Sequence, residues 1–99
     1  MDYKVVWSDL ALEDLQLIFD HLSEHQSQAA KSVVTKIIER VETLERFPSA
    51  GDVYRKQGPI RQVFSGVYRI FYCIDEAVRR VDVLAVRHGS RRNPKLPRI

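Results

Sequence analysis

Two apolar runs separated by a short polar segment constrain the fold of this chain more than any other feature. The runs are Val67–Ile74 and Val81–His88, and residues 75–80 lie between them. Both runs are rich in β-branched and aromatic residues, which favour extended backbone, and neither shows the periodicity of a helix. The pattern therefore predicts a β-hairpin at the centre of a small sheet.

Two shorter segments extend this predicted sheet. Residues 60–64 form a third run, which we expect to join the hairpin through a two-residue turn at Ser65 and Gly66. Residues 3–7 predict a short strand at the start of the chain. Because residues 52–59 are mostly polar and contain Gly and Pro, we expect a loop there. The predicted sheet therefore has four strands.

Two amphipathic helices are predicted between the first strand and the rest of the sheet. Apolar residues recur every three to four positions over residues 9–24 and again over residues 27–46. Ser8 and Ser27 stand where N-caps are expected, and Pro48 ends the second helix. Neither helix can bury its apolar stripe alone, so we expect an antiparallel helical hairpin that covers the sheet.

The outer face of the first predicted helix is acidic. Its acidic residues are Glu13, Asp14, Asp20 and Glu24. The same stretch contains no Lys or Arg, and His21 and His25 lie within it or just beyond it. We expect all of these side chains to contact solvent.

This order of elements predicts one domain over residues 1–99, with a two-layer α+β fold. Its parts are a strand, a helical hairpin and a three-stranded antiparallel meander. No apolar run approaches the roughly 20 residues of a membrane helix, and the chain begins Met-Asp-Tyr-Lys without an apolar signal segment. We therefore expect a cytoplasmic protein without a membrane partner.

The single cysteine limits the chemistry that the chain can support. Cys73 lies among apolar residues of the central strand, where we expect it to be a small core side chain. One cysteine excludes an internal disulfide and a multi-cysteine metal site. We expect neither a metal ion nor a cofactor.

The charge is divided unevenly along the chain. Residues 1–52 contain five Lys or Arg and ten Asp or Glu, whereas residues 53–99 contain eleven and three, giving net charges of −5 and +8. This asymmetry favours an acidic partner, and the alternative is that it only aids solubility. The candidate binding residues are Arg55, Lys56, Arg61, Arg69, Arg87, His88, Arg91 and Arg92. The last two belong to a basic C-terminal tail, residues 89–99.

Arg69 lies on an apolar face of the central strand. By strand alternation, Val67, Arg69, Phe71 and Cys73 share one face, and Tyr68, Ile70, Tyr72 and Ile74 share the other. A guanidinium among apolar neighbours requires an anionic partner or an open surface. Arg69 therefore predicts either a binding surface or a salt bridge across the hairpin to Asp82 or Glu76.

Four local patterns, in this order, resemble the ParE/RelE superfamily of type II toxins. They are Ala11-Leu12-Glu13-Asp14-Leu15, Phe47-Pro48-Ser49-Ala50-Gly51, Tyr68-Arg69-Ile70-Phe71-Tyr72 and Val83-Leu84-Ala85-Val86-Arg87-His88-Gly89. With Trp7 at the end of the first strand, the resemblance spans about residues 3–92. The Leu-Glu-Asp-Leu and Phe-Pro-Ser-Ala-Gly patterns are more similar to the ParE branch.

The resemblance implies a toxin that is held inactive by a cognate antitoxin encoded beside it. ParE-like members act on DNA gyrase without known nuclease chemistry, and RelE-like members cut messenger RNA on the ribosome. We expect the ParE-like function. A RelE-like ribonuclease and a decayed member that binds only antitoxin or DNA are the alternatives.

An antitoxin partner is also consistent with the basic second half of the chain. Antitoxin C-terminal segments are typically disordered before binding, and many are acidic with apolar anchors. A groove lined by Arg61, Arg69 and Arg87 beside an exposed Tyr or Phe would hold such a segment. We expect the meander and the basic tail to make most of the contacts.

The ribonuclease alternative needs an acid, a base and cations at a phosphodiester. The candidates are Arg61 and Arg69 for phosphate, with His88 as acid or base; Lys56 is a further loop cation. The resemblance places Arg69 and His88 where some of these nucleases keep a catalytic Arg and His. However, no Tyr follows Tyr72, although a C-terminal Tyr is common in such nucleases. The other interpretation of His88 is a strand-end histidine bonded to backbone.

Overall fold

The structure is a computed structural model that describes residues 2–54, 58–90 and 96. Its helices are α1 (Asp9–Ser23) and α2 (Ser27–Glu42), followed by the 3₁₀ turns η1 (Thr43–Glu45) and η2 (Pro48–Ala50). Its strands are β1 (Lys4–Trp7), β2 (Asp52–Val53), β3 (Ile60–Ser65), β4 (Tyr68–Asp75) and β5 (Arg80–His88). Among these described residues, no helix is long and apolar enough to cross a membrane.

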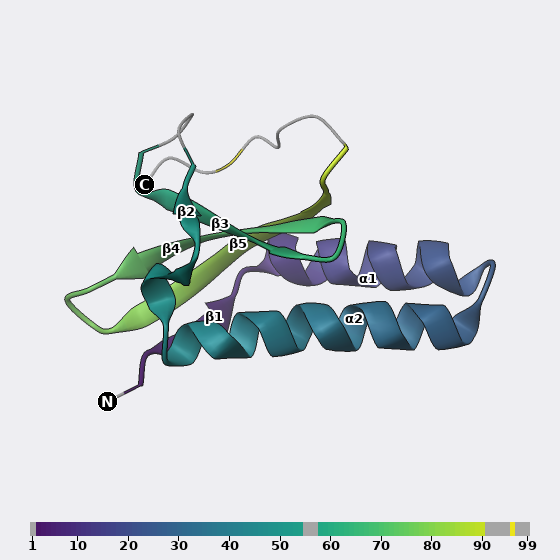
Figure 1. The fold of residues 1–99 in the computed structure, drawn as a ribbon, viewed down its shortest axis with the longest axis horizontal. Coiled ribbons are helices and arrows are strands. Elements are labelled where there is room, and N and C mark those ends of the chain that lie inside the picture. The colour runs from purple at the N-terminus through teal and green to yellow at the C-terminus, as the bar shows by residue number, and fades with distance from the viewer. Residues whose placement is uncertain (1, 55–57, 91–95, 97–99) are drawn as a thin grey trace.

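The strands form one mixed sheet in the order β1-β5-β4-β3-β2 (Figure 1). The predicted meander is confirmed as β3, β4 and β5, and β1 adds to it in parallel beside β5. The described part of the sheet has five strands rather than four, because Asp52 and Val53 pair with Gln62 and Arg61. A two-residue edge strand is too short to leave a periodic signal in the sequence.

Both helices cover the same face of the sheet, below it in Figure 1. Ala11 and Ile37 from the helices pack with Ile70, Tyr72 and Val83 from the strands in the main core. The alternation predicted for β4 is confirmed. The other face of β4 contributes to a second cluster, on the opposite side of the sheet from the main core. It is made of Tyr54, Ile60, Phe71, Cys73, Leu84 and Ala85, with Leu10 of α1 and Leu96 packed against it.

The predicted N-cap of α1 is confirmed, and that of α2 is wrong. The Ser8 Oγ accepts a hydrogen bond from the backbone N–H of Ala11 at 3.0 Å. Ser27 is already the first residue of α2; the cap position belongs to Gln26, which has extended backbone and makes no side-chain cap bond. The helix also ends earlier than predicted, at Glu42, where the chain tightens into η1.

The turn between β3 and β4 lies one residue later than predicted. Ser65 pairs with Tyr68, so the two turn residues are Gly66 and Val67. Gly66 has a φ of 57°, a left-handed conformation that glycine adopts without a steric penalty.

Two of the patterns found in the sequence meet inside the core. The Tyr72 hydroxyl donates to the Pro48 carbonyl at 2.6 Å and accepts from the Gly51 N–H at 2.9 Å. A Cβ at Gly51 would lie 2.6 Å from the Gln62 carbonyl oxygen and 2.7 Å from the Tyr72 hydroxyl. The turn after α2 is therefore held on the central strand, and it needs glycine there.

Candidate functional site

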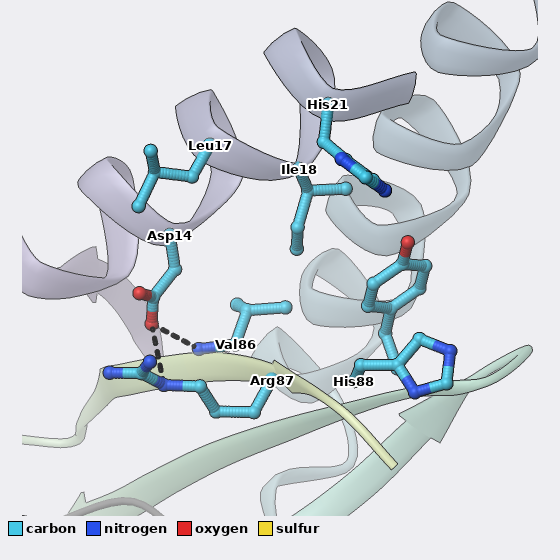
Figure 2. Close-up of a pocket in the computed structure, with 8 residues that line it drawn as sticks. Asp14, Leu17, Ile18, His21, Val86, Arg87 and His88 are labelled. Carbon is cyan, nitrogen blue, oxygen red and sulfur yellow. Dashed lines mark hydrogen bonds and ion pairs between the residues drawn. The ribbon is translucent and has the colours of Figure 1, made fainter. Parts of the chain in front are cut away.

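A pocket of about 370 Å³ opens between α1 and the ends of β4 and β5 (Figure 2). Helix α1 contributes Asp14, Leu17, Ile18 and His21; β4 contributes Tyr68; and β5 contributes Val86, Arg87 and His88. We call it the α1–β5 pocket. Two of the residues singled out in the sequence, Arg87 and His88, lie here.

The pocket lies along the edge of β5, at the point where β1 ends and α1 becomes the neighbour of β5. Strand β1 ends at Trp7, opposite Val83, so the next residues of β5 have no strand on that side. The Ser8 hydroxyl donates to the Leu84 carbonyl at 3.1 Å. The Asp14 carboxylate accepts from the Val86 N–H at 2.9 Å. These side chains replace strand pairing and fix α1 against the edge of the sheet.

Asp14 is a buried carboxylate at the base of the pocket. Only 4% of Asp14 is exposed, and its Oδ2 lies 3.5 Å from the Arg87 Nε. Burial raises the pKa of the Asp14 carboxyl, while the Val86 N–H and then the Arg87 charge act in the opposite direction. The prediction that Asp14 belongs to the solvent-facing acidic side of α1 is therefore wrong.

The position of Asp14 on the helix explains this difference. Asp14 shares the inward face of α1 with Ala11 and Ile18, which lie three and four residues away from it. The sequence did contain a signal for this burial: Asp14 lies within the apolar stripe of the helix, and a basic residue, Arg87, stands at the end of a predicted strand.

A β-bulge decides which way Arg87 and His88 point. Tyr72 pairs with Val83 and Phe71 with Ala85, so Leu84 is an extra residue in β5. After the bulge, Arg87 pairs with Arg69 and lies on the side away from the helices. His88 is turned to the helix side, into the pocket.

His88 is held by its neighbours. Its ring lies edge-on to Tyr68, with the ring centroids 5.5 Å apart. The backbone N–H of Ser90 donates to His88 Nδ1 at 3.1 Å, and the Ser90 Oγ lies 2.7 Å from the same atom. In the neutral ring this bond places the proton on Nε2. This geometry agrees with the interpretation of His88 as a strand-end histidine bonded to backbone.

The three-arginine groove predicted from the sequence is not formed. Arg61 pairs with Tyr72 on the helix side of the sheet, and its Nη1 donates to the Gly51 carbonyl at 2.8 Å. Arg69 lies on the opposite side, with its guanidinium carbon 5.1 Å from the centre of the Phe71 ring. Arg87 shares the Arg69 side but is paired with Asp14 at the sheet edge.

The register also excludes the predicted salt bridge from Arg69. Asp82 lies opposite Cys73, four residues along β4 from Arg69, and accepts from the Arg80 Nε at 2.8 Å. Glu76 accepts from the Tyr3 hydroxyl. Arg69 instead stands in a cross-strand row with Phe64 on β3, whose side chain is 53% exposed. The predicted binding residues Arg55, Lys56, Arg91 and Arg92 lie outside the described residues.

Metal binding has no support in the described part of the chain. There, no group of three or more His, Cys, Asp or Glu side chains is arranged to hold an ion. Cys73 is buried, and burial raises the pKa of its thiol, which disfavours the reactive thiolate.

Comparison with known proteins gives a consistent result. A family model described as the ParE toxin of the type II toxin–antitoxin system parDE matches residues 5–93. A comparison with curated protein sequences finds no match. The family match includes all four sequence patterns and the three β5 residues that line the pocket, Val86, Arg87 and His88.

Solved structures share the fold at low sequence identity. A chromosomal ParDE system from Pseudomonas aeruginosa contains a chain with a TM-score of 0.76 and 18% identity, covering 87% of this chain and 95% of that one. A chain of the RelBE2 toxin–antitoxin complex from Mycobacterium tuberculosis has a TM-score of 0.69 and 23% identity, covering 89% of this chain and 99% of that one. A chain of the RelE–RelB complex from Pyrococcus horikoshii has a TM-score of 0.69 and 19% identity, covering 93% of this chain and 100% of that one.

Proposed function

Because the chain belongs to the ParE toxin family of type II toxin–antitoxin systems, we propose that it binds and inhibits DNA gyrase. A cognate antitoxin encoded beside it holds it inactive. Residues 1–99 act as one toxin domain in the cytoplasm, where gyrase works. The observation that carries this proposal is the family match over residues 5–93.

The arrangement of the candidate catalytic residues supports a binding function over a nuclease. Arg61 and Arg69 lie on opposite sides of the sheet. His88 faces the helix side, in the α1–β5 pocket. A phosphodiester would have to contact all three groups at once for the predicted acid–base reaction. These residues are too dispersed to act on one phosphate as a single site.

The side of the sheet that carries Arg69 is the candidate surface for the macromolecular partners. Phe64, with an exposed side chain, pairs across the strands with Arg69, and aromatic residues and arginine are both enriched at protein interfaces. The second half of the chain supplies the positive charge that an acidic antitoxin segment needs. Arg55, Lys56, Arg91 and Arg92 are further proposed contacts.

Expression of the chain alone in bacteria tests the proposal. We expect growth arrest with altered plasmid supercoiling and intact messenger RNA, and rescue by the antitoxin gene. Messenger cleavage that is lost in His88→Ala or Arg69→Ala, with normal plasmid topology, would identify a RelE-like ribonuclease instead. Harmless expression of a folded chain would identify a decayed member of the family.

The basic tail provides a second test of the partner assignment. We expect deletion of residues 91–99 to weaken the antitoxin complex or to abolish toxicity, because it removes four positive charges. Leu96→Ala is the matched control, since Leu96 packs on the second cluster and carries no charge. Binding and toxicity equal to those of the intact chain after deletion would contradict the role of the tail.

A further inference from the structure

The α1–β5 pocket joins an apolar wall to a group of polar atoms. Leu17 and Ile18 of α1, with Val86 of β5, form the apolar part. His21 and His88 come to the pocket from its two walls, α1 and β5 (Figure 2). The side chain of Leu17 is 65% exposed, so it offers apolar surface at the rim. A ligand that fits this pocket has an apolar body and one polar end.

The polar groups that remain available include a hydrogen-bond donor on His88 and two groups, Tyr68 and His21, that can donate or accept. The Asp14 carboxylate is already engaged by the Val86 N–H and the Arg87 guanidinium. His88 Nδ1 accepts from Ser90, which leaves the Nε2–H of the neutral ring as a donor. Within the described residues, the Tyr68 hydroxyl and the His21 ring nitrogens make no hydrogen bond with protein atoms. A ligand acceptor can therefore be bonded by the His88 Nε2–H and the Tyr68 hydroxyl together.

We propose that the α1–β5 pocket binds an apolar monocarboxylate. The carboxylate accepts from His88 Nε2 and the Tyr68 hydroxyl, and the apolar body packs against Leu17, Ile18 and Val86. This binding site is separate from any action on gyrase.

Other charges fit the pocket less well. A dianionic phosphate needs more positive charge, and the only guanidinium among the lining residues is paired with Asp14. A cation finds one carboxylate in the pocket lining, Asp14, whose Oδ2 already accepts from the Val86 N–H and is paired with Arg87.

Two sources present this chemistry: a small free acid, or an acidic residue next to an apolar one in a bound protein segment. An NMR titration of the purified full-length chain with phenylacetate tests the site directly. We expect saturable shifts of the His21 and His88 ring signals at fixed pH. Phenethylamine and inorganic phosphate, which carry the wrong charge, are expected to bind at least tenfold more weakly.

Matched variants separate the pocket from the rest of α1. We expect His88→Ala to weaken phenylacetate binding at least tenfold, which is the usual effect of removing one hydrogen bond to a charged group. His25→Ala, outside the pocket, is expected to leave the affinity unchanged. Leu17→Ser is expected to weaken binding, and Leu12→Ser, an exposed leucine on the same helix but not in the pocket, is not.

Repeating the titration on the complex with the antitoxin distinguishes the two sources. If the antitoxin abolishes phenylacetate binding, a protein segment supplies the carboxylate; if binding persists, the ligand is a free acid. Shifts that do not saturate, or equal affinities in His88→Ala and His25→Ala, would overturn the proposal. Since no gyrase is present, this result is independent of the proposed toxin activity.

Discussion

At the scale of single residues, Tyr72 and Asp14 connect segments that lie far apart in the sequence. Tyr72 joins the central strand to the turn after α2 through both of its hydroxyl hydrogen bonds. Asp14 joins α1 to the end of β5 through the Val86 N–H and the Arg87 guanidinium. These two contacts relate all four sequence patterns in pairs. The residues of these patterns therefore mainly stabilise the fold.

Removing the Tyr72 hydroxyl tests the first contact. We expect Tyr72→Phe to lower the free energy of unfolding by about 1–3 kcal/mol, because the buried Gly51 N–H loses its acceptor. Tyr68→Phe is the matched control and is expected to have little effect, since the Tyr68 hydroxyl has no hydrogen bond among the described residues. Chemical denaturation measures both changes. Equal losses in the two variants would contradict this role for Tyr72.

The pH dependence of stability tests the second contact. Burial raises the pKa of the Asp14 carboxyl, so the folded chain binds this proton more tightly than the unfolded chain. The resulting stabilisation is fully present below the unfolded-state pKa of about 3.9 and is lost as pH rises through the folded-state value. The free energy of unfolding of Asp14→Asn should therefore rise relative to that of the wild type over this range. Denaturation at several pH values measures it, and a relative fall would contradict the account.

At the scale of secondary structure, the sequence predicted the helices and the meander because their patterns are long and periodic. The apolar stripes of α1 and α2 and the alternation of β4 each extend over several residues. The bulge at Leu84 left no such signal, because one extra residue in an apolar strand changes neither composition nor periodicity. Without it, the faces of Arg87 and His88 could not be predicted. Asp14 was placed wrongly because charged residues on helices usually face solvent.

The Ser8 side chain stabilises both the N-terminus of α1 and the edge of the sheet. Its Oγ accepts from the Ala11 N–H and donates to the Leu84 carbonyl. We expect Ser8→Ala to lower the free energy of unfolding by roughly 1–2 kcal/mol, since both bonds are lost. Ser27→Ala, at the start of α2 without a cap bond, is expected to change it by less than about 0.5 kcal/mol. A smaller loss in Ser8→Ala than in Ser27→Ala would contradict this role.

At the scale of the whole molecule, the helices close one side of the sheet and leave Phe64 and Arg69 on the other. The charge separation along the chain is also partly a separation in space, because α1 contains four acidic residues and no Lys or Arg. Tyr54 and Leu96 cover part of the sheet surface away from the helices. The sequence placed Arg61 in a groove with Arg69 and Arg87. In the structure, strand alternation turns Arg61 to the helix side of the sheet, away from Arg69.

The proposed function of this chain is the inhibition of gyrase by binding, as expected of a ParE-like toxin. The most direct test adds the purified chain to purified DNA gyrase, relaxed plasmid and ATP, and measures supercoiling and cleaved DNA. We predict that supercoiling falls and gyrase-dependent cleavage rises with toxin concentration, and that the antitoxin restores normal activity. Unchanged supercoiling and cleavage with a folded, antitoxin-binding chain would contradict the account.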